Sequence, residues 1–360
     1  MASKPLSVAH ISLARGYKGN ERQTELLIKE LAKLGVPQTL VCRDDSPLPI
    51  HVEGVNKLRI VKIAGLSDPS FIGHFKIGSS PTILHAHEAH AIKWCFLHYL
   101  FFGIPYIITA RKPNPEKKGF FDNAYYNSAA AVVGISKIIK NNFEQAFKRK
   151  VEFIGDCSSN FRANPEIVQR YRQALKNRFV VGQVGSLVNR ENSQTTLIDA
   201  AKLLKQQLPE LVLVFVGAGD DMGLLRMHAE GMPNVKFIGF KRNYIDYIAS
   251  FDVFAYPVNQ EGVGSIILDT MEQGVPVIAS AVDGIPDLIK NGVNGFLIKP
   301  GDAKSLAHYI LQLKRDRGTR NSLVQNAYAE VENHGSSAMA ASYYRLYTAI
   351  INGEYIKKEA

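Results

Sequence analysis

The chain has 360 residues, and 46% of them are hydrophobic. This length exceeds one average domain and fits two domains of roughly 150 to 200 residues, each with its own core. The longest apolar stretch, residues 94–108, is broken by His98, Gly103 and Pro105 and is shorter than the roughly 20 residues that cross a bilayer. We interpret it as a buried helix that runs into a buried strand, which argues against a membrane-spanning protein.

The formal net charge of +10 is concentrated in the first half of the chain. Residues 1–177 hold 25 Lys and Arg against 14 Asp and Glu, whereas residues 178–360 hold 18 against 19. A basic half attracts anionic partners such as nucleic acid, anionic lipid or phosphorylated glycan, although a basic surface with no partner is the simpler alternative. Since no helix-turn-helix or aromatic-rich RNA platform is recognisable, we do not expect nucleic acid to be the partner.

The N-terminus and the cysteines indicate the compartment. The first residues lack the long apolar segment of a signal peptide. Cys42, Cys95 and Cys157 are scattered without metal-ligand spacing, which is typical of reduced thiols in a cytoplasmic protein.

The first half of the chain alternates short apolar runs with amphipathic segments. After the opening run, the predicted helix has Asn20 as its N-cap, carries Leu27 and Leu31 on its apolar face, and ends at Gly35. Alternation of strands and helices predicts a parallel sheet that is covered on both faces. The predicted strands are 6–13, 38–42, 82–86, 106–109 and 131–134.

The second half repeats this scheme. The polar region 156–178 has no strand-like run, so we predict a linker there, and residues 336–353 are predicted to form a last helix. The predicted strands are 180–185, 211–219, 235–239, 253–256, 275–280 and 295–298.

The fold class that follows is α/β, with two Rossmann-like, doubly wound domains that face each other across a cleft. We expect an N-terminal domain at 1–165, a C-terminal domain at 178–335, and a segment 336–360 that packs back on the first domain. Ligands of such sheets bind beyond the carboxyl ends of the strands.

Residues 259–302 form the most informative segment. Gly262 and Gly264 lie in a loop after a strand, where glycine lets the backbone approach a ligand closely. A helix is predicted to begin at Ser265, and its free N–H groups and dipole favour an anion such as a diphosphate. Glu261 before this helix and Asp269 within it are candidates to accept hydrogen bonds from sugar hydroxyls.

This segment resembles the C-terminal signature of the GT-B-fold glycosyltransferases of retaining family 4, also called group 1. The signature is E-G-x-G-x-x-x-L-E-A-M-A-x-G-x-P-V-I-A-S, followed by G-G-x-x-E and N-G-x-L-x-x-P-x-D. The resemblance implies that Glu261 contacts the donor sugar and that Asp269 contacts the ribose. Asp269 and Asp287 each replace a Glu of the signature, so their side chains are one methylene shorter.

The segment 184–204 resembles the phosphate-binding part of the same family, with one departure. The family's Arg and Lys are replaced here by Ser186 and by Asn192 or Glu191. Arg190 is the first candidate to offset the charge of the leaving diphosphate, and Lys241 and Arg242 are further candidates. The chain contains no D-x-D triplet, so we expect neither a metal nor a cofactor, since the nucleotide sugar is a substrate.

Two segments of the first half also resemble the family. Gly19 and Asn20 replace the Gly-Gly of its opening loop, and the strand end at 85–90 resembles its H-x-H. The resemblance implies that His87 can hydrogen-bond a hydroxyl of the donor sugar and that Glu88 faces the cleft. A zinc site made by His85, His87 and His90 is an alternative that we do not favour, because these residues lie where a strand passes into a helix.

The basic loop 109–121 makes the chain most similar to family members of lipopolysaccharide core assembly. The resemblance implies a metal-independent, retaining transfer from a nucleotide-diphosphate sugar, with UDP favoured, to an anionic glycan or lipid-linked acceptor. It places the enzyme in the cytoplasm, peripherally bound to the anionic inner face of the membrane. A nucleotide- or glycan-binding protein without turnover and a GT-B sugar-nucleotide epimerase remain alternatives.

The expected site residues fall into three groups. The catalytic group is Glu261, His87 and Arg190; the donor-binding group is Gly19, Asn20, Gly185, Arg190, Gly217, Phe240, Lys241, Glu261, Gly262, Val263, Gly264, Ser265 and Asp269; and the acceptor-binding group is Lys18, Glu88, Arg111, Lys112, Lys117 and Lys118.

Overall fold

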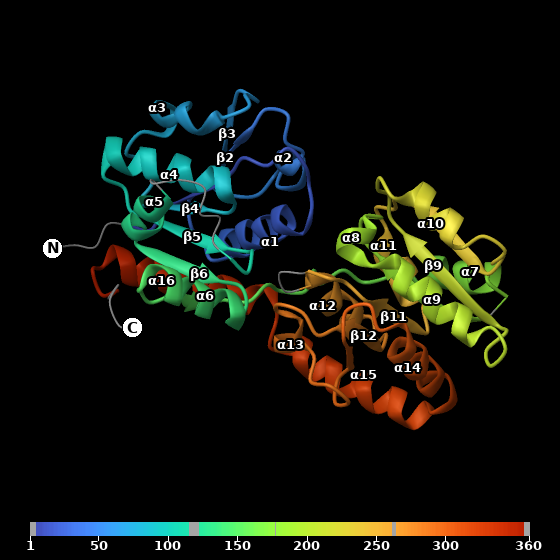
Figure 1. Cartoon of the computed structure of the whole chain (residues 1–360). Coiled ribbons are helices and arrows are strands. Elements are labelled where there is room, and N and C mark those ends of the chain that lie inside the picture. The colour runs from blue at the N-terminus through green and yellow to red at the C-terminus, as the bar shows by residue number, and fades with distance from the viewer. Residues whose placement is uncertain (1–4, 115–121, 177, 261–263, 356–360) are drawn as a thin grey trace. The chain divides into compact units, whose positions relative to one another are not determined.

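The computed structural model describes residues 5–114, 122–176, 178–260 and 264–355 (Figure 1). It divides into two compact units, one made of residues 1–157 and 336–360 and the other of residues 158–335. We call them the N-terminal unit and the C-terminal unit, and we describe each by itself. Each contains one parallel β-sheet with helices packed against it, so the α/β fold class is confirmed.

The sheet of the N-terminal unit has seven strands in the order β3-β2-β1-β4-β5-β6-β7, all parallel. The order reverses between β1 and β4, which are paired in register from Val8 with Ile83 to Ile11 with Ala86. The strands are β1 Val8–Ser12, β2 Gln38–Arg43, β3 Leu58–Ile63, β4 Ile83–Ala86, β5 Tyr106–Ala110, β6 Ala131–Gly134 and β7 Glu152–Phe153.

Helices α1 and α16 pack together on one face of this sheet, and α4 covers the opposite face (Figure 1). The prediction that Asn20 is the N-cap of the first helix is wrong, because Lys18 is the N-cap and the Glu21 carboxylate accepts the Lys18 N–H. The helices are α1 Gly19–Lys33, α2 Leu48–His51, α3 His74–Ile77, α4 Ala89–Phe102, α5 Asp122–Ser128, α6 Lys137–Phe147 and α16 Ser336–Ile351, together with the 3-10 turn η1 Pro69–Phe71.

The last helix, α16, completes the core of the N-terminal unit. Tyr343 and Tyr347 are buried against Leu27 of α1 and Ile107 of β5. Their hydroxyls reach the sheet, since Tyr347 lies 2.7 Å from Nδ1 of His85 and Tyr343 lies 2.8 Å from the hydroxyl of Thr109. The core of this unit therefore combines the two ends of the chain.

The sheet of the C-terminal unit has six parallel strands in the order β10-β9-β8-β11-β12-β13. Its order reverses between β8 and β11, so this unit is also doubly wound. The strands are β8 Phe179–Val184, β9 Leu211–Val216, β10 Val235–Gly239, β11 Val253–Tyr256, β12 Val277–Ser280 and β13 Phe296–Ile298.

In the C-terminal unit, α9 packs beside α14 and α12 packs beside α15. None of the described helices of the chain is both long and apolar enough to span a bilayer. The helices are α7 Pro165–Ala174, α8 Asn189–Asn192, α9 Gln194–Leu204, α10 Met222–His228, α11 Tyr244–Ala249, α12 Ser265–Glu272, α13 Ile285–Leu288, α14 Ala303–Arg315 and α15 Arg317–Glu332.

The segment expected to be a linker, 156–178, holds the helix α7. Asn164 caps this helix through its side chain, and Arg172 forms an ion pair with Asp252 at 2.8 Å. The ring of Tyr171 stacks on that of Tyr247, with centroids 4.1 Å apart. The 10 residues of α7 within the predicted linker thus form an integral helix of the C-terminal unit.

Candidate functional site

In the C-terminal unit, a crevice is expected where the strand order reverses, between the carboxyl ends of β8 and β11. The loops after these two strands are joined by hydrogen bonds. The backbone N–H of Asn259 donates to the carbonyl of Glu191 at 2.8 Å, and its side-chain amide donates to the carbonyl of Arg190 at 3.0 Å. The short helix α8, which carries Arg190, is therefore fixed to the loop that leads to Glu261.

Gly185 and Gly217, at the ends of β8 and β9, bring two loops together backbone to backbone. A Cβ on Gly217 would lie 1.8 Å from the carbonyl oxygen of Gly185, far inside van der Waals contact, and Gly217 has φ of 151°. Only glycine fits this position. The two predicted donor-binding glycines thus lie at the carboxyl ends of β8 and β9, where they let the two loops approach each other closely.

Helix α12 begins at the same edge of the sheet. Gly264 is its N-cap with φ of 74°, a left-handed conformation that favours glycine, and Ser265 is its first residue. The helix therefore presents its positive dipole end where the sequence predicts the diphosphate. Glu261, Gly262 and Val263 lie outside the described residues, so their contacts with the donor remain a prediction.

Asp269 is buried, and both of its carboxylate oxygens have partners in the protein. One oxygen accepts the backbone N–H of Ser159 at 2.7 Å, and the other accepts the hydroxyl of Tyr244 at 2.9 Å. Through these bonds Asp269 of α12 holds the start of the C-terminal unit and α11 together. This structural role is sufficient to explain an acid at position 269, whether or not a nucleotide binds there. The contact of Asp269 with a ribose stays a prediction.

Ser186 and Asn192, which stand at or next to the positions of the family's basic pair, are hydrogen-bonded to each other. The amide of Asn192 donates to the carbonyl and to the hydroxyl of Ser186 at 2.8 and 3.0 Å. Beside them, the Arg190 side chain is 86% exposed and lies 3.6 Å from Glu191, so it is available to a ligand. After β10, Phe240 and Arg242 are exposed and Lys241 is half-buried.

In the N-terminal unit, the strand order reverses between β1 and β4, and two bonds join the loops at this point. The backbone N–H of His87 donates to the carbonyl of Ile11 at 3.1 Å, and the backbone N–H of Leu13 donates to the carboxylate of Glu88 at 2.9 Å. His87 therefore lies at the position where a doubly wound sheet binds its ligand. The residues that begin α1, namely Lys18, Gly19 and Asn20, are exposed.

Glu88 has a structural role. Its carboxylate caps α4 by accepting the backbone N–H groups of His90 and Ala91 at 2.7 and 3.1 Å, in addition to that of Leu13. These three donors occupy the carboxylate, and such a cap stabilises a helix by about 1 kcal/mol. These bonds explain an acid at position 88 by its role as a cap, and a contact of Glu88 with the acceptor stays a prediction.

A chain of hydrogen bonds across three strands fixes the protonation of His87. The side-chain N–H₂ of Gln38 donates to the carbonyl of Ile28, so the side-chain oxygen of Gln38 accepts a hydrogen bond from Nε2–H of His10 at 3.0 Å. Nδ1 of His10 then accepts from Nε2 of His87, also at 3.0 Å. Nδ1 of His87 is left as a buried acceptor with no partner among the described residues. A buried acceptor without a partner is rare in proteins, and a hydroxyl donor would satisfy it.

Burial keeps this histidine cluster neutral. Desolvation lowers the pKa of His10 to about 4 and holds the pKa of His85 and of His87 well below the ordinary value. The positive charge of Arg111 acts in the same direction on His85 and His87. The imidazoles therefore act as hydrogen-bonding groups, and not as cations, at neutral pH.

The zinc alternative named His90 beside His85 and His87. In the structure the third histidine near these two is His10. Among the described residues, His10, His85 and His87 are the group whose ligand atoms, within 4.8 Å of one another, are close enough for a metal ion. Both ring nitrogens of His85 already have partners, the hydroxyls of Tyr347 and Thr109 at 2.7 Å each. His90 is exposed and lies 3.6 Å from Glu88. The set is best described as a hydrogen-bonded network.

Arg111, which the sequence predicts as an acceptor contact, is mostly buried, with its side chain 10% exposed. Its guanidinium donates to both oxygens of Asp156 at 2.7 and 2.9 Å, beside the histidines. The neighbouring carboxylate compensates the charge of this largely buried cation, and the contact of Arg111 with an acceptor stays a prediction. Lys112 is exposed, and Lys117 and Lys118 lie outside the described residues.

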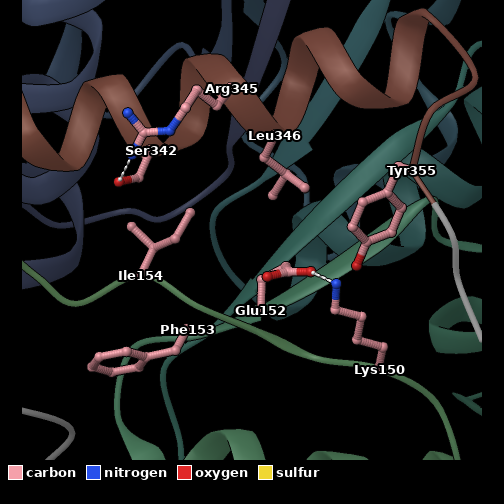
Figure 2. Close-up of a pocket in the computed structure, with 8 residues that line it drawn as sticks. All are labelled: Lys150, Glu152, Phe153, Ile154, Ser342, Arg345, Leu346 and Tyr355. Carbon is pink, nitrogen blue, oxygen red and sulfur yellow. Dashed lines mark hydrogen bonds and ion pairs between the residues drawn. The ribbon is translucent and has the colours of Figure 1, made fainter. Parts of the chain in front are cut away.

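A separate hollow of about 320 Å³ lies between β7 and α16 (Figure 2). Lys150 and Glu152 form an ion pair of 2.9 Å in it, below the ring of Tyr355. Because β5 and β6 separate β7 from β4, this hollow is remote from His87. We do not assign it to the site. Its lining is Lys150, Glu152, Phe153, Ile154, Ser342, Arg345, Leu346 and Tyr355.

Solved structures resemble the whole chain. Anabaena Alr3699/HepE, solved in complex with UDP and glucose, superposes with a TM-score of 0.82 at 20% identity and covers 96% of this chain and 100% of its own. The lipopolysaccharide outer core galactosyltransferase WaaB superposes with a TM-score of 0.72 at 16% identity, over 97% of this chain and 100% of its own. Together with two doubly wound units, these similarities define the class: the chain has the GT-B fold of glycosyltransferases.

The sequence comparisons point to the same class. Residues 167–330 match the family described as Glycosyl transferases group 1. The lipopolysaccharide core biosynthesis glycosyltransferase LpsE of Rhizobium meliloti (strain 1021) is 26% identical over 91% of this chain and 95% of its own length. The capsular polysaccharide biosynthesis glycosyltransferase CapM of Staphylococcus aureus is 27% identical over 58% of each chain.

Proposed function

We propose that this protein transfers a sugar from a UDP-sugar to an anionic, lipid-linked glycan such as the core of lipopolysaccharide. The observation that carries the proposal is the group 1 match over residues 167–330, which includes every loop at the expected donor crevice. The names of LpsE and WaaB support a lipopolysaccharide acceptor, and the complex of HepE supports UDP.

In the proposed reaction the C-terminal unit holds the nucleotide. The dipole of α12 and the exposed Arg190 stabilise the leaving diphosphate, and Glu261 orients the donor sugar. Nδ1 of His87 accepts a hydrogen bond from a sugar hydroxyl. The transfer proceeds with retention and without a metal, and closure of the site excludes the water that would hydrolyse the donor.

The N-terminal unit binds the acceptor in this proposal. Its positive charge suits phosphates and acidic sugars, with Lys18, Lys112, Lys117 and Lys118 as the contacts. The enzyme would act in the cytoplasm, bound peripherally to the anionic inner face of the membrane.

A thermal-shift series with UDP, GDP, ADP and CMP tests the donor site. A ligand that binds only the native state adds about 2.7 kcal/mol to the unfolding free energy at a hundredfold excess over Kd. We expect UDP alone to raise the melting temperature clearly, and UDP-sugars to release UDP when the acceptor is added. A shift with none of the four nucleotides would contradict the proposal.

The bond between Ser186 and Asn192 favours a second candidate, a GT-B protein that binds nucleotide without turnover. Neither residue supplies the positive charge that the diphosphate needs on leaving. This candidate predicts a UDP shift with no release of UDP from any UDP-sugar, whereas a sugar-nucleotide epimerase would convert the donor in the absence of acceptor.

A further inference from the structure

The N-terminal unit exposes a group of large apolar side chains around α3 and the end of α4. Phe75 is 84% exposed, Phe71 64%, Leu100 59% and Phe101 58%. We call Phe71, Phe75, Leu100 and Phe101 the aromatic face. Single exposed apolar residues are common on protein surfaces, but a contiguous group of this kind marks an interaction site.

Phe75 and Phe101 are neighbours in space, and Phe71 lies against the same helix, α4. The ring of Phe75 lies 6.3 Å from that of Phe101 and 5.6 Å from that of Phe102, and η1, which carries Phe71, packs on α4. The Lys93 ammonium lies 4.4 Å above the ring of Phe71. Helix α3 and the end of α4, which are distant in the sequence, therefore meet at Phe75, Phe101 and Phe102, and Phe71 lies further along α4 beside Lys93.

The support beneath this surface is firmly packed. The ring of Trp94, fully buried in α4, stacks on those of His74 and His98 at 4.3 and 5.0 Å, and its indole N–H donates to the carbonyl of Ile72 at 2.8 Å. Almost all residues of α4 are apolar, so the helix buries one side on the sheet and presents another to solvent. The apolar side chains of the aromatic face thus belong to a defined platform.

Basic side chains border the aromatic face. Arg59 donates to the carbonyl of Lys76, and the Lys76 ammonium donates to the carbonyl of Lys62, at 3.0 Å each, which places all three exposed cations beside α3. Lys93 is paired with Asp68 at 2.6 Å and adds little net charge. The border is therefore positive.

We propose that the aromatic face docks this protein on an anionic lipid bilayer. Aromatic rings insert at the level of the lipid headgroups, and lysines beside them are attracted to anionic lipid. A second copy of the chain fits less well, since a two-fold contact would bring the same cations together. The inference rests on the proposed function only in that a lipid-linked acceptor brings the enzyme to a membrane.

Co-sedimentation of the full chain with vesicles tests the proposal. We expect binding to vesicles of phosphatidylcholine mixed with phosphatidylglycerol, and weak binding to phosphatidylcholine alone. The double variant Phe75→Ser/Phe101→Ser should bind the mixed vesicles at least about tenfold more weakly, with an unchanged UDP shift. The matched control is Leu224→Ser/Met227→Ser, an exposed apolar pair on α10 of the C-terminal unit, which should bind like the wild type.

The charges are tested separately. Binding to the mixed vesicles should be weakened by the double variant Lys62→Glu/Lys76→Glu. The control is the double variant Lys205→Glu/Lys236→Glu, at an exposed pair in the C-terminal unit, which should weaken binding less than the first variant does. Vesicle binding that survives the aromatic substitutions would overturn the proposal, as would a dimer in sedimentation equilibrium that they abolish. Vesicle binding by a protein that shows no UDP shift would refute the proposed function alone.

Discussion

Glu261 is the residue on which the proposed transfer depends most, because it is the acid next to the N-terminus of α12. Glu261→Ala should lower transfer from a UDP-sugar by at least about 100-fold, since an interaction with the reacting sugar is lost. The melting temperature should stay unchanged. The measurement is UDP release with acceptor present, and Glu230→Ala, at an exposed acid of the same unit, is the control. Equal transfer by Glu261→Ala and wild type would refute this role.

The buried histidines make the N-terminal unit sensitive to acid. His10 has a pKa of about 4 in the folded chain, against about 6.5 when unfolded. Between these values the unfolded state takes up a proton that the folded state does not, so the free energy of unfolding falls as the pH falls. His10 alone should cost roughly 2 kcal/mol at about pH 5 relative to about pH 7. His85 and His87 act in the same direction.

Urea unfolding followed by tryptophan fluorescence can measure the pH dependence of stability in the N-terminal unit alone. The single tryptophan of the chain, Trp94, is buried in that unit. The loss of stability between about pH 7 and pH 5 should be smaller in His10→Gln than in the wild type. His308→Gln, at an exposed histidine of the C-terminal unit, should leave it unchanged. The same pH dependence in wild type and His10→Gln would show that burial of His10 is not its cause.

At the residue scale, local motifs were predictable and partners across strands were not. The signature after Glu261 and the strand end at His87 are short segments that the sequence displays directly. His10 and Gln38 were missed because they reach His87 only when β2, β1 and β4 lie side by side, an order that the sequence does not state. Likewise, Asp156 cancels the charge of Arg111 from 45 residues away.

At the scale of elements, the contact between the loops after β8 and β9 makes a sharp prediction. Gly217→Ala places a Cβ against the carbonyl of Gly185, and a backbone atom cannot rotate away. We expect a loss of at least about 2 kcal/mol of stability, together with loss of the UDP shift.

Gly223 in α10 provides the matched control. A Cβ there meets nothing within 4 Å, so Gly223→Ala should stabilise the unit by up to about 1 kcal/mol through its helix propensity. Urea unfolding followed by circular dichroism measures both variants. Equal stability of Gly217→Ala and wild type would contradict the close approach of the two loops.

Elements with a clear apolar run were predicted, and those without one were missed. Buried parallel strands such as β4 and β9 form continuous apolar runs. The edge strand β3 exposes Arg59, Ile60 and Lys62, so its run is interrupted, and β7 has only two residues. The polar sequence of 156–178 predicts a linker there. The structure has helix α7 in this segment, and because none of its residues is fully buried, it shows no apolar run in the sequence.

At the scale of the whole molecule, the two units differ in how their chain is assembled. The C-terminal unit draws its core from the continuous segment 158–335, whereas the core of the N-terminal unit includes Tyr343 and Tyr347 of α16. Removing α16 would expose apolar surface of α1 and β5 and leave His85 without its tyrosine partner. A buried polar group without a partner costs about 1–3 kcal/mol, in addition to the lost packing.

Three fragments test this difference. Residues 158–335 alone should unfold cooperatively and keep the UDP shift, because both their core and the loops around Arg190 are intact. Residues 1–157 alone should show no cooperative transition in Trp94 fluorescence, and joining residues 336–360 to them through a short Gly-Ser linker should restore it. If residues 1–157 alone fold as stably as the joined fragment, α16 is an attached helix and not part of that core. If residues 158–335 fold but bind no UDP, the donor site needs groups from the N-terminal unit.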